Sequence, residues 1–305
     1  MLTFLGRRLA MSLLTLSGIV VITFFLARLT GNASVLYLPF DASAQMIANF
    51  NHQHGFDLPV LVQFGRFVRD LVHLDFGMSL SQQRPAAVAV FSAMPITFEL
   101  MGLAVVVMLL LSVTLGSIAA LRPFSKVDNT ITFIALGTTS LPDFWLALVG
   151  ILIFAVYLGL VPTSGTHGAA AWILPLLTLS IPPTGSMIQV SRGAMIEALN
   201  AGYVQNARAR GYRRPRLAFR HALRNAALPI VTVAGDRVVH LLNGTIIVGA
   251  VFAFPGIGSV IMQAVLYRDF PLLQASVFIT GATVIILNLL IDIAYTTIDP
   301  RVRIS

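Results

Sequence analysis

Residues 97–121 read TFELMGLAVVVMLLLSVTLGSIAAL, a stretch in which Glu99 is the only charged side chain. The hydrocarbon core of a bilayer is about 30 Å thick, and a helix of about 20 apolar residues spans it. The stretch therefore predicts a transmembrane helix. Glu99 stands at its start, where we expect an interfacial carboxylate.

The composition of the whole chain also indicates that lipid is its main solvent. Of the 305 residues, 57% are hydrophobic and 10% are charged, and the mean hydropathy is +0.86. A soluble domain carries about 25% charged residues, so too few polar side chains remain here to cover a water-facing surface. The chain has no cysteine, which excludes disulfides and thiolate metal sites.

Six segments are long and apolar enough to span a bilayer, so the predicted fold class is an all-α integral membrane protein with six transmembrane helices. Prolines inside such helices are tolerated because neighbouring helices satisfy the freed carbonyls. The segments are residues 9–29, 97–121, 131–160 with an interruption at Leu141-Pro142-Asp143, 172–195 with Pro175, Pro182 and Pro183 inside it, 228–252, and 272–297. The first is longer than the apolar region of a signal peptide, so we expect an uncleaved anchor.

The basic residues predict the orientation. Alternating the segments between the two sides places fourteen basic residues with the two termini and five on the opposite side, while Arg237 falls within a span. The positive-inside rule then predicts that both termini lie in the cytoplasm. The formal net charge of +8 fits anionic lipid headgroups, and no aromatic-basic surface accompanies the arginines to suggest nucleic acid.

The largest extramembrane piece, residues 30–96, contains a predicted amphipathic helix over residues 58–74. Its apolar residues recur at helical spacing, and Pro59 suits the first turn. Such a helix either lies on the outer leaflet or receives a docking partner. His52 and His54 in this piece are expected to be solvated surface residues rather than metal ligands.

Residues 203–229, YVQNARARGYRRPRLAFRHALRNAALP, alternate arginines with apolar residues and are interrupted by Gly211 and Pro215. The pattern predicts an amphipathic helix–turn–helix on the cytoplasmic face. Such an element can lie on lipid or offer an apolar and basic surface to the groove of a soluble partner.

This loop resembles the coupling loop of ABC-type importer permeases of the dipeptide, oligopeptide and nickel group, which carry YVRTARAKG followed by RHALRNALLP. Five further elements match that group in order along the chain: HLDFGMS at 73–79, LPDFW at 141–145, VFAFPGIG at 251–258, RDFP at 268–271 and DPRVR at 299–303. The chain departs from the pattern of that group in two places. Thr30-Gly31-Asn32-Ala33 replaces P-G-D-P, and Gly249 replaces a common glutamate.

The resemblance implies a type I importer permease of the bacterial inner membrane with cytoplasmic coupling helices. Residues 1–96 would form an anchor helix with a periplasmic segment, and residues 97–305 a core of five transmembrane helices with a coupling loop at about 200–227. The residues that would contact the ATPase subunits are Gln205, Asn206, Ala207, Gly211, Arg213 and Arg214. The implied partners are a second similar permease, two cytosolic ATPase subunits and a periplasmic or lipid-anchored substrate-binding protein.

The chain is expected to be non-catalytic. Its only lysine is Lys126, which follows no glycine-rich phosphate loop, so ATP and Mg²⁺ would be bound by the partner subunits and no cofactor or metal by this chain. No nucleophile–base motif is present. The alternative function is a secondary transporter or channel driven by an ion gradient, which predicts two related halves that the sequence does not display. The cargo stays open among dipeptides, oligopeptides, nickel, metal chelates and opines.

The fifth predicted span carries Asp236, His240 and Asn243 on one helical face. Charged groups at the bilayer centre cost at least about 2.5–3.5 kcal/mol, so this face should avoid lipid. It either packs against the sixth span, where Asn288 and Asp292 form a similar pair, or lines a water-filled translocation pathway. We favour the pathway, because an aqueous cavity solvates these groups without matched partners.

Overall fold

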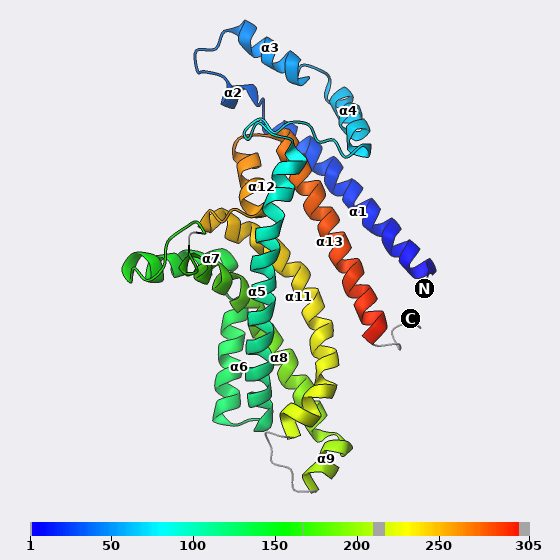
Figure 1. The fold of residues 1–305 in the computed structure, drawn as a ribbon, viewed down its shortest axis with the longest axis vertical. Helices are drawn as coiled ribbons and strands as arrows, with labels where there is room; N and C mark the ends of the chain where they lie inside the picture. The colour runs from blue at the N-terminus through cyan, green and yellow to red at the C-terminus, as the bar shows by residue number, and fades with distance from the viewer. Residues whose placement is uncertain (1, 167, 210–216, 299–305) are drawn as a thin grey trace. The chain divides into compact units, whose positions relative to one another are not determined.

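The computed structural model describes residues 2–166, 168–209 and 217–298. Within these ranges the chain is helical, with loops and an isolated antiparallel bridge between Met78 and Pro85 (Figure 1). The helices are α1 (Leu2–Leu29), α2 (Ser34–Tyr37), α3 (Ala44–His54), α4 (Val60–Val72), α5 (Ala86–Leu121), α6 (Lys126–Thr139), α7 (Asp143–Gly150), the π-helical η1 (Ile151–Tyr157), α8 (Ala170–Asn200), α9 (Gly202–Ala209), the π-helical η2 (Leu217–Ala222), α11 (Leu223–Phe252), α12 (Ile257–Leu266) and α13 (Phe270–Ile298).

The predicted spans correspond to these helices. Five helices in the described part of the chain, α1, α5, α8, α11 and α13, are long and apolar enough to cross a membrane. The third predicted span is α6 followed by α7 and η1, which bend by 99° at the interruption, and counting this pair as one span gives six. Figure 1 shows α7 turned away from the axis of α6. The bend follows from Pro142, which disfavours helical backbone at the preceding residue, Leu141.

The chain forms two compact units. The first contains residues 1–95 and 255–286, and the second contains 96–254 and the chain from 287 onward. Because α5 and α13 each pass from one unit to the other, the first unit combines the amino-terminal part of the chain with the later segment 255–286.

The predicted amphipathic helix packs part of its apolar face against α1 in the first unit. Phe67 on α4 is buried, and its ring stacks on Phe24 of α1 at a centroid distance of 5.4 Å. Phe64 contacts Phe24 edge-on at 5.1 Å and Phe25 in a tilted arrangement at 5.4 Å. The helix therefore uses its aromatic residues to fix the carboxyl end of α1 rather than leaving them all to lipid.

A buried carboxylate joins distant segments of the first unit. Asp269, in the turn between α12 and α13, is fully buried. Its Oδ2 accepts hydrogen bonds from the Ser79 hydroxyl at 2.6 Å and from both the N–H and the hydroxyl of Ser81 at 2.8 and 2.7 Å. Its Oδ1 accepts one from the N–H of Leu272 at 3.1 Å. These donors compensate the cost of burying the charge.

In the second unit α8 packs against α6, α7, α9, η2 and α11. Two glycines permit close helix crossings. A Cβ at Gly185 of α8 would overlap the backbone oxygen of Ala135 on α6, and one at Gly116 of α5 would lie 2.6 Å from Cβ of Ser191 on α8. Small residues at crossings let membrane helices approach closely enough for van der Waals packing, which makes α8 the central helix of this unit.

Candidate functional site

The predicted coupling element begins at α9, directly after α8. Val204 on α9 is fully buried and belongs to an apolar cluster with residues of α8 and η2, among them Met195 and Leu217. Gln205 and Asn206 are exposed, and Ala207 is half-buried. One side of α9 is thus anchored to the bundle while its polar side is free to contact a partner. The predicted residues Gly211, Arg213 and Arg214 lie outside the described residues.

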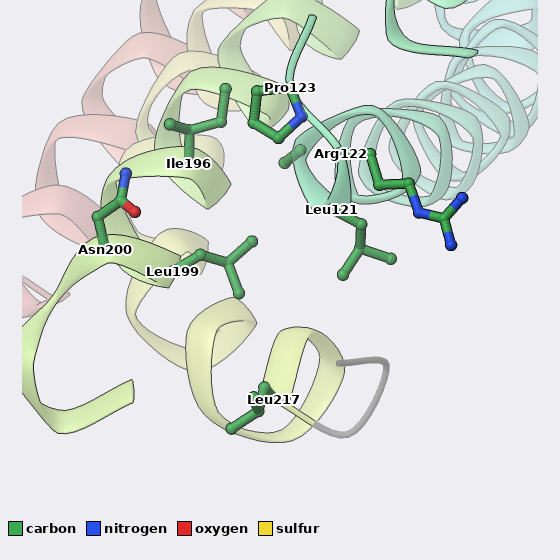
Figure 2. A pocket seen from close by; sticks show the side chains of 8 residues that line it. Leu121, Arg122, Pro123, Ile196, Leu199, Asn200 and Leu217 are labelled. Carbon is green, nitrogen blue, oxygen red and sulfur yellow. The ribbon is translucent and has the colours of Figure 1, made fainter. Parts of the chain in front are cut away.

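A pocket of about 290 Å³ lies next to this element. It is formed by the end of α5, the turn into α6, the end of α8 and the start of η2, and Figure 2 shows Leu121 and Leu199 on its two sides. Arg122 and Asn200 supply polar groups among its lining residues, while Leu217 supplies an apolar one. The helices that hold α9 therefore leave accessible space between their ends.

An ion pair that the sequence did not predict holds the start of α6 to α8. Arg192 donates from Nε to Oδ1 of Asp128 at 2.5 Å and from Nη2 to Oδ2 at 2.7 Å. Asp128 is 1% exposed and also accepts the N–H of Phe124 at 2.7 Å. The orientation count includes Arg192 as a free basic residue, whereas the structure pairs its charge with Asp128. The sequence feature that could have pointed to Asp128 is its position in the first helical turn after Ser125. The Ser125 hydroxyl accepts a hydrogen bond from the Asp128 N–H at 3.3 Å.

The three predicted pathway residues lie on α11. Asp236 and His240 are each 65% exposed, with the imidazole Nε2 3.9 Å from a carboxylate oxygen, and Asn243 is exposed as well. α11 packs on α8 and α7. The structure thus brings Asp236 and His240 together on an exposed face.

His240 also lines a second pocket, of about 240 Å³, together with residues of α6, α7 and α8. Arg237 and Asp143 are the charged residues that face this pocket with it. Sequence reasoning recognised Arg237 as an arginine within a span but did not assign Asp143, whose position became visible only with the bend between α6 and α7.

The two histidines of α3, His52 and His54, have local partners. Nδ1 of His52 lies 2.9 Å from a carboxylate oxygen of Asp57, and the His54 ring packs on Phe50 at a centroid distance of 4.3 Å. Among the described residues no group of three or more His, Cys, Asp or Glu is placed to hold a metal ion.

Comparison with known families identifies the fold. A family model described as "Binding-protein-dependent transport system inner membrane component" matches residues 112–304. The chain belongs to this family. It is therefore a multi-pass transport component, and its helices form the permease fold of type I ABC importers.

Relatives of this permease match over nearly its full length. It is 30% identical to the "Oligopeptide transport system permease protein AppB" of Bacillus subtilis, over 99% of this chain and 100% of the relative. It is 31% identical to the "Dipeptide transport system permease protein DppB" of Alkalihalophilus pseudofirmus and 32% identical to the "Oligopeptide transport system permease protein OppB" of Haemophilus influenzae. Both matches cover 99% of this chain and 100% of the relative.

Solved structures share the fold of the permease at low sequence identity. The methionine ABC transporter MetNI in inward-facing conformations has a TM-score of 0.55 at 19% identity, covering 69% of this chain and 94% of that chain. An amino acid ABC transporter with histidines has a TM-score of 0.54 at 18% identity, covering 68% and 94%. At this identity the likeness bears on the fold alone.

Proposed function

We propose that this permease imports peptides. It would form the membrane pathway together with a second, similar permease, receive cargo from a substrate-binding protein outside, and be driven by two cytosolic ATPase subunits that bind ATP and Mg²⁺. The observation that carries the proposal is the full-length match to permeases named for oligopeptide and dipeptide transport. Peptides are therefore preferred over nickel or metal chelates as cargo.

The coupling surface of this proposal is the polar side of α9. Gln205 and Asn206 are exposed there, and Ala207 together with Gly211, Arg213 and Arg214 continues the sequence motif. Because Val204 packs into the cluster that includes α8 and η2, a displacement of α9 by the ATPase subunits would move these helices with it. ATP binding would then shift the equilibrium between outward-facing and inward-facing states.

The pathway surface is the exposed face of α11 that carries Asp236, His240 and Asn243. One observation and one general cost support it. The three side chains are exposed on the isolated subunit, and charged groups that face lipid within a membrane span are costly. α11 packs directly on α8, the helix that also anchors α9. Movement at the cytoplasmic end would therefore reposition the groups that passing cargo meets. Both termini would be cytoplasmic in this arrangement.

Uptake of a labelled peptide into proteoliposomes tests the function. The vesicles contain both permeases and the ATPase subunits, with the binding protein outside and ATP inside. Uptake is expected to require both ATP and the binding protein, and to stop when the ATPase subunits carry inactive phosphate loops. Uptake that continues without ATP and collapses when an ionophore removes the ion gradient would instead support the secondary-transporter alternative.

A further inference from the structure

The pocket beside the bend between α6 and α7 contains two charged groups of opposite sign. It measures about 240 Å³ and is lined by Thr139 of α6, Asp143 of α7, Ser186 of α8 and Arg237 of α11, among others. Asp143 is half-buried, and its Oδ2 would lie 3.7 Å from a Cβ added at Gly244 of α11. The same Cβ would lie 2.6 Å from Cδ1 of Leu179, so the glycine lets Leu179 and the carboxylate lie close to α11.

Neither charge is matched within the described part of the chain. Nε of Arg237 is buried and has no hydrogen-bond partner there. Opposite-charge pairs within 4.0 Å in these residues include Arg192 with Asp128 but not Arg237 with Asp143. Ionised groups in membrane helices normally pair with one another or face water or a ligand. The pocket thus holds a cation and an anion that are separate from each other.

Pro183 leaves one backbone carbonyl of α8 without its usual partner within the helix. Leu179 of α8 lines the pocket, as does Pro183 four residues later. Proline has no N–H, so the carbonyl of Leu179 lacks the donor that would normally bond it within the helix. An ammonium group near Asp143 could use such a carbonyl as a second acceptor, while the planar guanidinium of Arg237 suits a carboxylate.

We propose that this pocket binds a short zwitterionic peptide during its passage, with the peptide carboxylate on Arg237 and its ammonium group on Asp143. The inference deepens the proposed function and rests on it. Drug-sized ligands occupy pockets of about 300–1,000 Å³, so a pocket of about 240 Å³ suits a dipeptide better than a long oligopeptide.

Binding of labelled dialanine to the purified permease–ATPase complex, without binding protein, tests the proposal. Unlabelled dialanine, N-acetyl-dialanine and dialanine amide are used as competitors. The ratio of the affinities for dialanine and its amide gives the preference for a free carboxylate. The ratio for dialanine and its N-acetyl form gives the preference for a free amine. Arg237→Gln is expected to lower the preference for the free carboxylate by about tenfold or more and leave that for the free amine, since hydrogen bonds to charged groups are worth that much. Asp143→Asn is expected to show the reverse pattern. Glu99→Gln, at an exposed carboxylate on α5, should keep both preferences.

Two results would overturn the proposal. One is a wild-type complex that imports dialanine with binding protein and ATP yet does not bind it alone; the other is an equal change of both preferences in each variant. Failure of wild-type uptake would instead contradict the proposed function. If the charge variants do not assemble, Ser186→Leu fills the pocket while keeping both charges, and it should weaken dialanine binding at least about tenfold. Unchanged binding by that variant would place the cargo elsewhere.

Discussion

Arg192 of α8 and Asp128 of α6 form a two-pronged ion pair in which each carboxylate oxygen accepts one hydrogen bond from the guanidinium. Asp128 is 1% exposed and the Arg192 side chain 24% exposed. Removing one partner of such a pair leaves the other charge partly buried and uncompensated. The pair therefore fixes the relation of α6 to α8 only as long as both residues are present.

Asp128→Asn is expected to lower the free energy of unfolding by about 2–3 kcal/mol, somewhat less than for a fully buried pair because Arg192 is partly exposed. The measurement is the midpoint of thermal unfolding of the permease in detergent. The double variant Asp128→Leu with Arg192→Met should recover most of the loss, because it removes both charges together. If the double variant is as unstable as the single one, the ion pair is not the cause.

Two glycines on α8 give a matched test of helix packing. Gly185→Ala should destabilise the protein by at least about 2 kcal/mol, because its Cβ would overlap the backbone of α6 and a backbone atom cannot move aside. Gly193→Ala on the same helix has nothing within 4 Å of the added Cβ. It should be neutral or stabilise by up to about 1 kcal/mol through helix propensity. Equal thermal stability of the two variants would contradict the close crossing.

Val204 is expected to matter for coupling through its anchoring of α9. Val204→Ala removes buried apolar volume worth about 2 kcal/mol and should loosen α9 from α8 and η2. Substrate-stimulated ATP hydrolysis and peptide uptake should then both fall. Gln205→Ala at the exposed neighbouring position should leave thermal stability unchanged, so any loss of hydrolysis there reports contact with the ATPase subunits instead. Full coupling in Val204→Ala would show that α9 does not depend on this anchor.

A pH dependence is expected from Tyr37, which lies outside the membrane spans. Burial raises its pKa well above the ordinary value, and the negative charge of Asp269 adds to the rise. Above about pH 10 an unfolded tyrosine ionises while the folded one stays neutral, so stability falls as pH rises through this range. Tyr37→Phe should reduce the fall in melting temperature between about pH 9 and pH 11.

The control for that substitution is Tyr203→Phe, at an exposed tyrosine on α9. A loss of melting temperature that is the same in the wild type and in Tyr37→Phe would exclude Tyr37 as its source.

Orientation is open to direct measurement because the chain has no cysteine of its own. With the fourteen-to-five distribution of basic residues, Gln53→Cys should react with a membrane-impermeant thiol reagent added outside spheroplasts, and Ser305→Cys should react only after the membrane is opened. The reverse labelling pattern would invert the topology.

The sequence predicted the spans well because a long apolar run depends on the bilayer and on few other contacts. It placed the start of the second span at Thr97, whereas α5 begins at Ala86. The reason is tertiary: Ala86, Ala89 and Val90 are buried in the cluster of the first unit, so the helix continues beyond the bilayer requirement.

The sites were less predictable than the spans. The pairing of Asp128 with Arg192 joins residues 64 positions apart, a separation at which periodicity carries no information. Similarly, the interruption at Leu141-Pro142-Asp143 predicted a break but not a 99° bend. That angle depends on packing against α8 and α11, and it decides that Asp143 shares a pocket with Arg237.

The first unit also determines when the protein can finish folding. Phe24, Phe64 and Phe67 are close in sequence and can meet early, but the same cluster requires Ile257, Leu272 and Ala275 from the far end of the chain. Likewise, the loop at Ser79 and Ser81 cannot complete its hydrogen bonds before Asp269, 188 or more residues later, has been synthesised. Since chains emerge from the ribosome amino end first, the segment made earliest must wait in the membrane for the last helix. A nascent chain truncated before residue 255 would therefore expose that unfinished surface to the quality-control proteases of the membrane.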